Sequence, residues 1–244
     1  MAIIRTYPDP DILATAVADH ILDTALESVS GHGIFAIALS GGSTPLPVYQ
    51  VLAQPPYSEQ MPWEYVHIFW SDERAVPPGH EKSNYSAAHR VLIEPLSLPE
   101  QNIHRIKGEL EPQQAADEYE QDIRDLVGGQ PPSFDLILLG LGTDAHTASL
   151  FPHSSALVSP PKSRLVVPNF VEKLDSWRIT FTPRLINAAR HVAFLVTGGE
   201  KADCVYQVLA GRHQPVEVPA QAIHPDNGAL SWYLDREAAR HLHT

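Results

Sequence analysis

Residues 34–45 read IFAIALSGGSTP, and this stretch decides the predicted fold. Its first part, residues 34–39, is a continuous apolar run with the length and composition of a strand that is buried on both faces. Two glycines, two hydroxyl side chains and a proline follow, and a helical pattern begins at residue 44. A strand that turns directly into a helix predicts a parallel sheet, with the turn at the carboxyl end of the strand.

The same alternation of strand and helix patterns continues along the chain. Further strands are predicted at residues 66–70, 134–139, 165–167, 178–181, 192–196 and 229–234, and helices at residues 10–29, 44–53, 84–93, 113–127 and 201–209. The run at 134–139 is the most hydrophobic, so we expect it near the centre of the sheet. The alternation predicts an α/β fold with a Rossmann-like, doubly wound, mainly parallel sheet and helices on both faces. No long polar linker interrupts the pattern, so we expect one domain over residues 1–244.

The composition argues against several classes of partner. The chain carries 17 basic and 29 acidic side chains, a net charge of −12, which argues against a nucleic-acid or anionic-membrane partner. The single cysteine, Cys204, can form neither an internal disulfide nor a cysteine-based zinc site, as is typical of a reducing compartment. No apolar stretch approaches the ~20 residues of a membrane span, and the start shows no signal-peptide pattern. We therefore expect a cytoplasmic protein.

The first strand exit has the composition of an anion site. It consists of Ser40, Gly41, Gly42, Ser43 and Thr44, followed by a proline. The glycines let the backbone turn sharply and expose its N–H groups at the start of a helix, where a phosphate can bind. Ser43 or Thr44 could cap that helix. An ordinary tight turn between strand and helix is an equally good interpretation of the motif. The motif is not a Walker A loop, because no Gly-Lys-Ser/Thr follows.

Charged side chains follow the second strand. Asp72, Glu73 and Arg74 come directly after it, and Asn84 lies just downstream. The guanidinium group of Arg74 is a rigid fork for a phosphate or a carboxylate. Asp72 or Glu73 could orient that arginine or accept sugar hydroxyls, and Asn84 would add a polar contact. The alternative is a solvated charge cluster, but the position at a strand exit favours a site.

The third strand exit predicts a general base. Residues 140–147 read GLGTDAHT, which superficially matches a dinucleotide-binding fingerprint. We reject that match because Asp144 would place a negative charge where the pyrophosphate binds. His146 can take a proton from water near neutral pH, and Asp144, two residues away, could orient its ring. The alternative is a capping aspartate beside an incidental histidine.

Two later cations also lie near strand ends. Arg178 begins a predicted strand, and residues 197–201, TGGEK, again combine glycines with the start of a helix. Lys201 at a helix N-terminus opposes the helix dipole, which favours a role with an anion. We interpret Cys204 as a packing residue. No pair of the other histidines shows a ligand spacing with a carboxylate, so we expect no metal site.

Six stretches of the chain resemble the 6-phosphogluconolactonase family, within the glucosamine-6-phosphate isomerase/deaminase superfamily. They occur in order and cover nearly the whole chain: LSGGSTP at 39–45, WSDER at 70–74, SNY at 83–85, GLGTDAHTASLFP at 140–152, RITFT at 178–182 and TGGEKA at 197–202. Each stretch alone is weak evidence for the family, whereas the complete set in this order is highly specific for it. The resemblance implies the corresponding fold.

The resemblance separates lactonases from deaminases and reveals one departure. Deaminases carry a Glu, within Asn-Glu-Pro, where this chain has Phe151, and their Asp-Glu-aromatic motif here ends in Arg74. Both differences indicate a lactonase. The family usually has Gly where Ala145 stands. If that position requires a positive φ, Ala145 adds strain of roughly 1 kcal/mol.

The resemblance implies hydrolysis of 6-phospho-D-glucono-1,5-lactone to 6-phospho-D-gluconate, the second step of the oxidative pentose phosphate pathway, without metal or cofactor. His146 would activate the attacking water, Asp144 would orient it, and Arg74 would contact the carbonyl oxygen or the phosphate. The glycine turn, Arg178 and Lys201 would hold the phosphate.

Two alternatives stay open: an isomerase or deaminase of sugar phosphates, and a non-catalytic sugar-phosphate sensor. The expected partner is a small sugar-phosphate lactone, and the expected assembly is a monomer or a weak homodimer.

Overall fold

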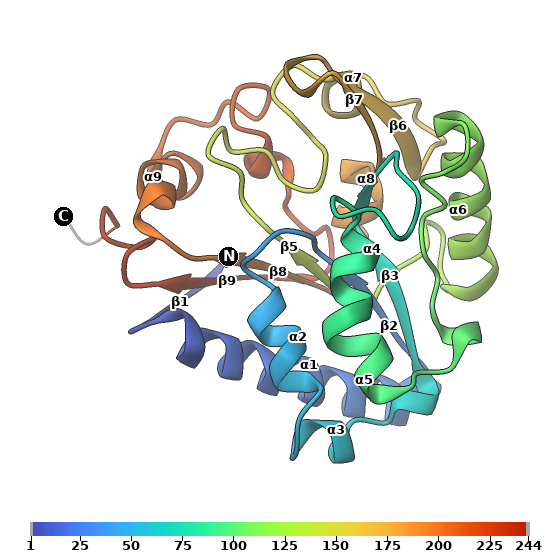
Figure 1. Cartoon of the computed structure of the whole chain (residues 1–244). Coiled ribbons are helices and arrows are strands. Elements are labelled where there is room, and N and C mark those ends of the chain that lie inside the picture. The colour runs from blue at the N-terminus through green and yellow to red at the C-terminus, as the bar shows by residue number, and fades with distance from the viewer. Residues whose placement is uncertain (1, 243–244) are drawn as a thin grey trace.

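Six strands pair in one parallel sheet in the computed structural model, which describes residues 2–242 (Figure 1). Their order is β1-β9-β8-β5-β2-β3, and every neighbouring pair is parallel. The strands are β1 (Ile3–Tyr7), β2 (Phe35–Leu39), β3 (Val66–Trp70), β5 (Leu136–Leu139), β8 (His191–Val196) and β9 (Ala229–Asp235). The prediction of a doubly wound, mainly parallel α/β fold is confirmed.

The predicted strands of this sheet lie where hydrophobic runs occur in the sequence. β5 is shorter than predicted, since it begins at Leu136, and it lies in the interior of the sheet as expected. β1 was not predicted. Its isoleucines, Ile3 and Ile4, are 48% and 47% exposed, and the segment has no continuous buried apolar run of the kind that predicts an interior strand.

Helices cover both faces of the large sheet (Figure 1). They are α1 (Pro10–His32), α2 (Leu46–Leu52), α3 (Tyr57–Gln60), α4 (Asn84–Ala88), α5 (Glu94–Leu96), α6 (Pro112–Leu126), α7 (Ser155–Val158), α8 (Pro183–Asn187) and α9 (Ala202–Ala210). A π-helical turn, η2 (His89–Ile93), joins α4 to α5, and five 3₁₀ turns occur at η1 (Trp63–Tyr65), η3 (Glu100–Asn102), η4 (Glu172–Leu174), η5 (Gly199–Lys201) and η6 (Pro219–Ala222). The helix α1 begins where the Asp9 carboxylate accepts two backbone N–H groups and ends at Gly33, whose φ is +91°.

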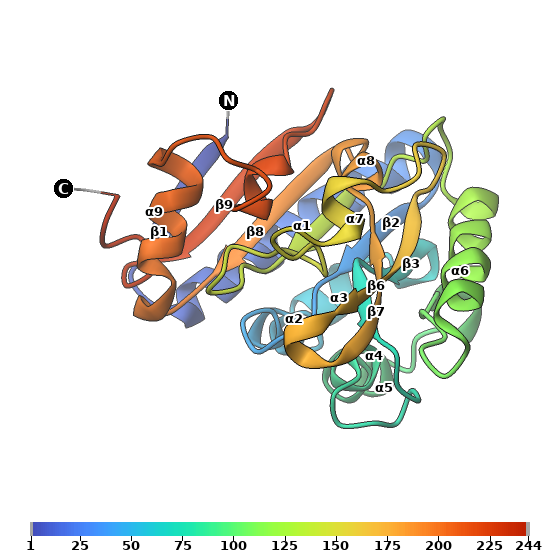
Figure 2. The same cartoon turned by 90° about the horizontal axis from the view of Figure 1, so that it is seen from above.

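A second, smaller sheet is antiparallel and was not predicted. It has the order β4-β7-β6 and consists of β4 (Asp72–Arg74), β6 (Val166–Val171) and β7 (Ser176–Phe181). Figure 2 shows β6 and β7 side by side. The segments predicted at 165–167 and 178–181 therefore lie outside the parallel sheet, because the short turn between them cannot make the crossover that parallel pairing requires.

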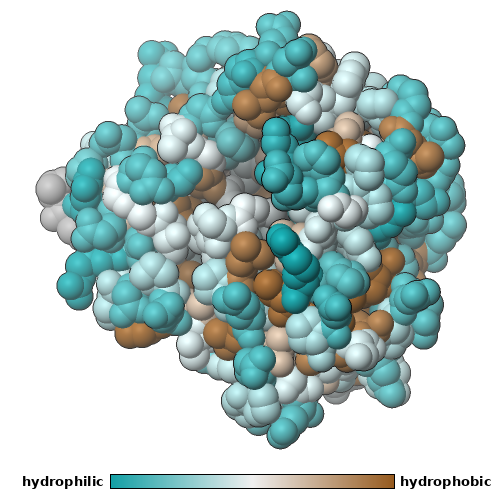
Figure 3. All heavy atoms as spheres, viewed as in Figure 1, coloured by the Kyte–Doolittle hydropathy of each residue, from teal (hydrophilic) through white to brown (hydrophobic). Residues whose placement is uncertain are grey.

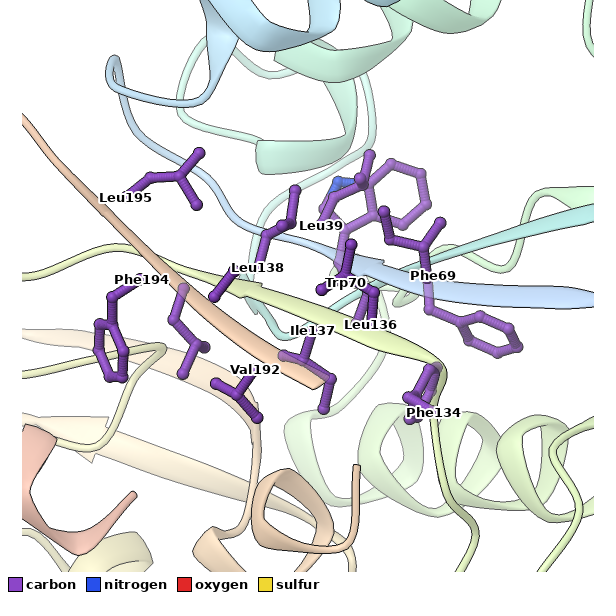
Figure 4. Packing of buried hydrophobic residues seen from close by; sticks show 14 of the residues in the cluster. Leu39, Phe69, Trp70, Phe134, Leu136, Ile137, Leu138, Val192, Phe194 and Leu195 are labelled. Carbon is purple, nitrogen blue, oxygen red and sulfur yellow. The ribbon is translucent and has the colours of Figure 1, made fainter. Parts of the chain in front are cut away.

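The core lies between the large sheet and its helices. Figure 4 shows side chains from four neighbouring strands, including Leu39, Trp70, Leu138 and Phe194, packed together. Strands buried on both faces explain why their sequences are continuous apolar runs. In Figure 3, which looks from the same direction as Figure 1, apolar residues occur as small separate patches among hydrophilic ones. Within residues 2–242, no helix combines the length and the apolar character needed to cross a membrane.

The order of strands creates a switch point between β2 and β5. From β2 the chain continues to β3 on one side, whereas β5 is followed by β8 and β9 on the other. The loops that leave β2 and β5 therefore diverge and leave a crevice at the carboxyl ends of these strands. A binding site is expected there.

Candidate active site

A cavity of about 620 Å³ lies at this crevice. Most of the predicted site residues line it, although they come from distant parts of the sequence: Ser40, Gly41, Gly42, Ser43, Thr44, Asp72, Arg74, Asn84, His146, Arg178 and Lys201. The glycine turn and His146 thus lie on the same side of the sheet. Two predicted residues, Asp144 and Glu73, are not among the lining residues.

Asp144 lies directly behind His146. The Nδ1 atom of His146 is 2.5 Å from Oδ1 of Asp144, and the backbone N–H of His146 also donates to this oxygen at 3.3 Å. Burial opposes the charge on Asp144, but hydrogen bonds from His146 and Lys173 outweigh it and hold the pKa of Asp144 well below its usual range. Because an ionised carboxylate only accepts, Nδ1 carries the proton and Nε2 is the free basic nitrogen.

Two unpredicted side chains complete this group. The ring of Phe151 stacks on His146 with 4.1 Å between centroids. The ammonium group of Lys173 forms an ion pair with Asp144 and lies 4.6 Å from the centroid of Phe151. Lys173 comes from η4, in the turn between β6 and β7, and no motif in the sequence connects it to Asp144. Phe151 lies within the quoted stretch 140–152. From the sequence it only distinguished this chain from deaminases, and its contact with His146 was not predicted.

The backbone of this loop is tight at two positions. Ala145 has a φ of +62°, so the positive φ considered from the sequence is present. A side chain at Gly142 would collide with the ring of His146 and with Asp144. Glycine is therefore required at 142 so that the imidazole can pack over the main chain.

The glycine turn, which lines the cavity, has backbone amides without a protein acceptor among the residues that the structure describes. Within residues 2–242, the backbone N–H groups of residues 41–44 donate no hydrogen bond to another protein group. The carboxamide of Asn84 packs against Gly41 at a position that a Cβ atom would occupy. Neither Ser43 nor Thr44 caps the helix, although the sequence allowed it: α2 begins after Pro45 without a side-chain cap, and the hydroxyl of Thr44 lies 3.2 Å from that of Thr197.

Arg74 and Arg178 lie opposite each other in the small sheet. They are register partners in the pair β4–β7, and both line the cavity. Burial lowers the pKa of Arg178, and the positive charge of Arg74 lowers it further. Within the described residues neither guanidinium group forms a salt bridge, although Arg74 donates to the carbonyl oxygen of Lys82. Two adjacent cations without a bridging carboxylate are suited to a shared anion.

The substrate-binding role predicted for Glu73 does not fit its position. Its side chain is 2% exposed and accepts hydrogen bonds from the N–H groups of Arg74, Asn84 and Tyr85 and from the hydroxyl of Ser83. Burial raises the pKa of Glu73, and these four donors oppose the rise. Glu73 therefore holds the start of α4 against β4. Both carboxylate oxygens of Glu73 accept hydrogen bonds from the protein, so neither is available to a substrate in the cavity.

Asp72 lies between the small sheet and the loop that carries His146. Its carboxylate accepts the hydroxyl proton of Ser149 at 2.6 Å, and the carboxamide of Asn84 donates to its carbonyl oxygen at 2.9 Å. It joins the loops from β3 and β5 and also lines the cavity.

The exit of β8 carries Lys201 into the site. Lys201 ends η5 directly before α9, as predicted for a lysine at a helix start. The turn is held by Asp235, a buried carboxylate at the end of β9 that accepts the N–H of Gly198. Asp235 was not predicted, because it comes just after the predicted strand 229–234 and belongs to no motif. Burial raises the pKa of the Cys204 thiol to about 11, which agrees with a packing role.

The donor groups at this site do not form a metal-binding cluster. Among residues 2–242, no group of three or more histidine, cysteine, aspartate or glutamate side chains has the arrangement needed to hold a metal ion. The cavity instead combines a basic imidazole, free amides and cations. The fold and this cavity together define an α/β enzyme that acts on a small anionic substrate.

Comparison with known proteins narrows the class. The family model of glucosamine-6-phosphate isomerases/6-phosphogluconolactonase matches residues 8–232. The chain is 38% identical over 243 residues to 6-phosphogluconolactonase of Nostoc sp., covering 98% of each chain, and 41% identical over 220 residues to that of Synechocystis sp., covering 88% of each. The solved structure of 6-phosphogluconolactonase from Trypanosoma brucei superposes with a TM-score of 0.87 at 30% identity, covering 99% of each chain. The chain belongs to the glucosamine-6-phosphate isomerase/6-phosphogluconolactonase family.

Proposed function

We propose that this enzyme hydrolyses 6-phospho-D-glucono-1,5-lactone to 6-phospho-D-gluconate, the second step of the oxidative pentose phosphate pathway. The names of its relatives support this reaction. The structural observation that supports it is one cavity lined both by His146 and by residues 41–44, whose backbone amides have no acceptor within the described residues. A general base and an anion site in the same cavity suit a sugar phosphate with a reactive carbonyl.

In the proposed mechanism, Nε2 of His146 takes a proton from a water molecule as that water attacks C1 of the lactone. The carboxylate of Asp144 accepts the Nδ1 proton, holds the ring in place and stabilises the imidazolium. When the tetrahedral intermediate breaks down, the bond between C1 and the ring oxygen is cleaved. The imidazolium then returns its proton to that oxygen, and the product is the open-chain acid.

The phosphate would be held by Ser40 and the amides and hydroxyls of residues 41–44, with Arg178 and Lys201 adding charge. We assign Arg74 to the phosphate rather than to the carbonyl oxygen. Arg74 is the register partner of Arg178, which we also place at the phosphate. In addition, Asn84 donates a hydrogen bond to Asp72, on the same strand as Arg74, and packs against Gly41 in the glycine turn. Between the phosphate and the lactone carbonyl, the carboxylate of Asp72 would accept hydrogen bonds from sugar hydroxyls, and the carboxamide of Asn84 would donate to them.

The His146→Ala variant tests the base. We expect kcat to fall by roughly 10²- to 10⁴-fold, the usual contribution of a positioned general base. The rate would be measured by a coupled assay for 6-phosphogluconate, corrected for spontaneous hydrolysis. His213→Ala, at an exposed position, serves as the matched control. Wild-type rates in His146→Ala would require another base.

The isomerase or deaminase alternative is not favoured. That chemistry requires a proton-transferring carboxylate where this chain has Phe151, and an apolar ring stacked on His146 cannot transfer protons. Release of ammonia from glucosamine 6-phosphate would contradict the lactonase assignment. Binding of sugar phosphates without turnover would instead support a sensor.

We further propose that residues 1–244 act as one sugar-phosphate lactonase domain, located in the cytoplasm, as a monomer or a weak homodimer. The uninterrupted match of the family model supports the single domain, and a lone cysteine is typical of a reducing compartment. Light scattering after size exclusion would give the mass of the assembly, for comparison with the 26.9 kDa chain.

A further inference from the structure

The glycine turn after β2 is fastened by the hydroxyl group of Tyr49. This tyrosine lies in α2 and is 1% exposed. Its hydroxyl oxygen accepts the N–H of Ser40 at 3.1 Å, and the hydroxyl donates to the carbonyl oxygen of Ser40 at 2.8 Å. One side chain therefore satisfies both backbone groups of the residue at which the strand ends and the turn begins.

Beyond Ser40, few contacts determine where the turn lies. Gly41 is in contact with Asn84, and Thr44 reaches Thr197 through its hydroxyl. Within the described part of the chain, the amides of residues 41–44 have no protein acceptor, so no backbone ladder holds them. Amides that are to converge on an anion must be positioned by other groups before the anion binds.

The end of the neighbouring strand β3 is also held by a tyrosine hydroxyl, but the backbone that follows it is bonded differently. The hydroxyl of Tyr119, in α6, accepts the N–H of Trp70 at 2.8 Å and donates to its carbonyl oxygen at 3.0 Å. After Trp70, however, backbone hydrogen bonds continue: Ser71 donates to Leu39, Phe181 donates to Ser71, and β4 pairs with β7. The position of this second exit therefore does not depend on its tyrosine.

We propose that Tyr49 is a positioning residue for phosphate binding, because its hydroxyl holds Ser40 so that the amides of residues 41–44 converge on the phosphate group. The inference rests on the proposed function and adds to it a residue outside the cavity lining. This role belongs to Tyr49 and not to Tyr119, although both tyrosines are buried and each bonds the N–H and the carbonyl oxygen of one residue.

The test compares Tyr49→Phe with Tyr119→Phe. Each substitution removes one hydroxyl and leaves one N–H and one carbonyl without a partner, so both variants should unfold at lower temperature. Tyr49→Phe should raise KM for the phosphorylated lactone, and the inhibition constant of inorganic phosphate, by roughly tenfold, with kcat within about twofold of wild type. Tyr119→Phe should leave both constants within about twofold of wild type. Hydrolysis of unphosphorylated glucono-1,5-lactone should be equal in all three proteins.

In the assays with the two lactones, two results would overturn the inference. One is an equal rise of KM in both variants; the other is the same loss by Tyr49→Phe on the unphosphorylated lactone. If the wild type did not hydrolyse the phosphorylated lactone, the proposed function would fail, whereas titration of wild type and variants with inorganic phosphate would still test the role of Tyr49. Unchanged phosphate affinity in Tyr49→Phe would then refute it.

Discussion

Ala145 adopts a backbone conformation that glycine adopts more readily. Its φ of +62° places a Cβ atom where it crowds the carbonyl oxygen, and the residue lies between Asp144 and His146. The structure thus confirms the condition under which the sequence predicted strain. The loop keeps this conformation because Ala145 donates to Gly142 and accepts from Ala220 through its backbone.

We predict that Ala145→Gly raises the free energy of unfolding by about 0.5–1 kcal/mol, because relief of the positive φ exceeds the loss of one methyl group and the added freedom of the unfolded chain. Chemical denaturation would measure the change. The same substitution at Ala16, inside the helix α1, should instead destabilise the protein. A destabilised Ala145→Gly protein would show that the methyl contacts outweigh the strain.

Elements bring together histidines that the sequence separates. His67, in β3, and His104, after η3, are joined by a 3.1 Å contact between Nδ1 and Nε2, and His104 stacks on Phe69. Burial lowers the pKa of His104 to about 4, with a further contribution from His67, whose own pKa burial also lowers.

The pair predicts how stability depends on pH. Below pH ~6.5 the unfolded chain binds protons at its histidines, whereas the folded chain keeps His104 neutral down to pH about 4. The free energy of unfolding should therefore fall as the pH is lowered from about 6.5 to about 4. In His104→Gln this fall should be shallower, as measured by urea denaturation across the window, while His213→Gln should match the wild type. Equal slopes in all three proteins would contradict the assignment.

The hairpin β6–β7 shows what an element adds to a site. Its turn carries Lys173 to Asp144, and its second strand carries Arg178 to Arg74. The sequence indicated Arg178 by its position in a motif. Nothing local indicated Lys173, because its role arises from an antiparallel pairing that the alternation of strands and helices does not predict.

At the scale of the whole molecule, a net charge of −12 opposes the binding of a phosphate dianion. Arg74, Arg178 and Lys201 must overcome this field locally. We predict that replacing all three by Ala raises KM for the phosphorylated lactone by more than tenfold, with little effect on the unphosphorylated lactone. Steady-state kinetics on both lactones would measure it.

A matched control separates the local cations from the overall charge. Replacing Arg90, Lys162 and Arg212, which are exposed and lie outside the cavity lining, changes the net charge equally. KM should stay close to the wild-type value. A similar rise in both triple variants would mean that the total charge of the molecule, not the site, determines phosphate affinity.

The sequence by itself determined every strand of the parallel sheet except β1, the longer helices and the three loops that carry His146, the glycine turn and Arg74. These features depend on local patterns: continuous apolar runs, glycines after a strand, and an aspartate two residues from a histidine. Each pattern reports the conformation of its own segment, so it can be recognised without knowing what packs against it.

Only the tertiary structure decided which of these segments share a cavity. It also decided which polar side chains hydrogen-bond within the protein instead of facing the cavity. The separate antiparallel sheet, the use of Glu73 to hold α4, and the arrival of Lys173 and Asp235 at the site all depend on contacts between distant residues. Such contacts are selected by burial and by the pairing of polar groups across the whole fold. A carboxylate near a strand exit can face a substrate or a helix start, and only its neighbours in space decide between them.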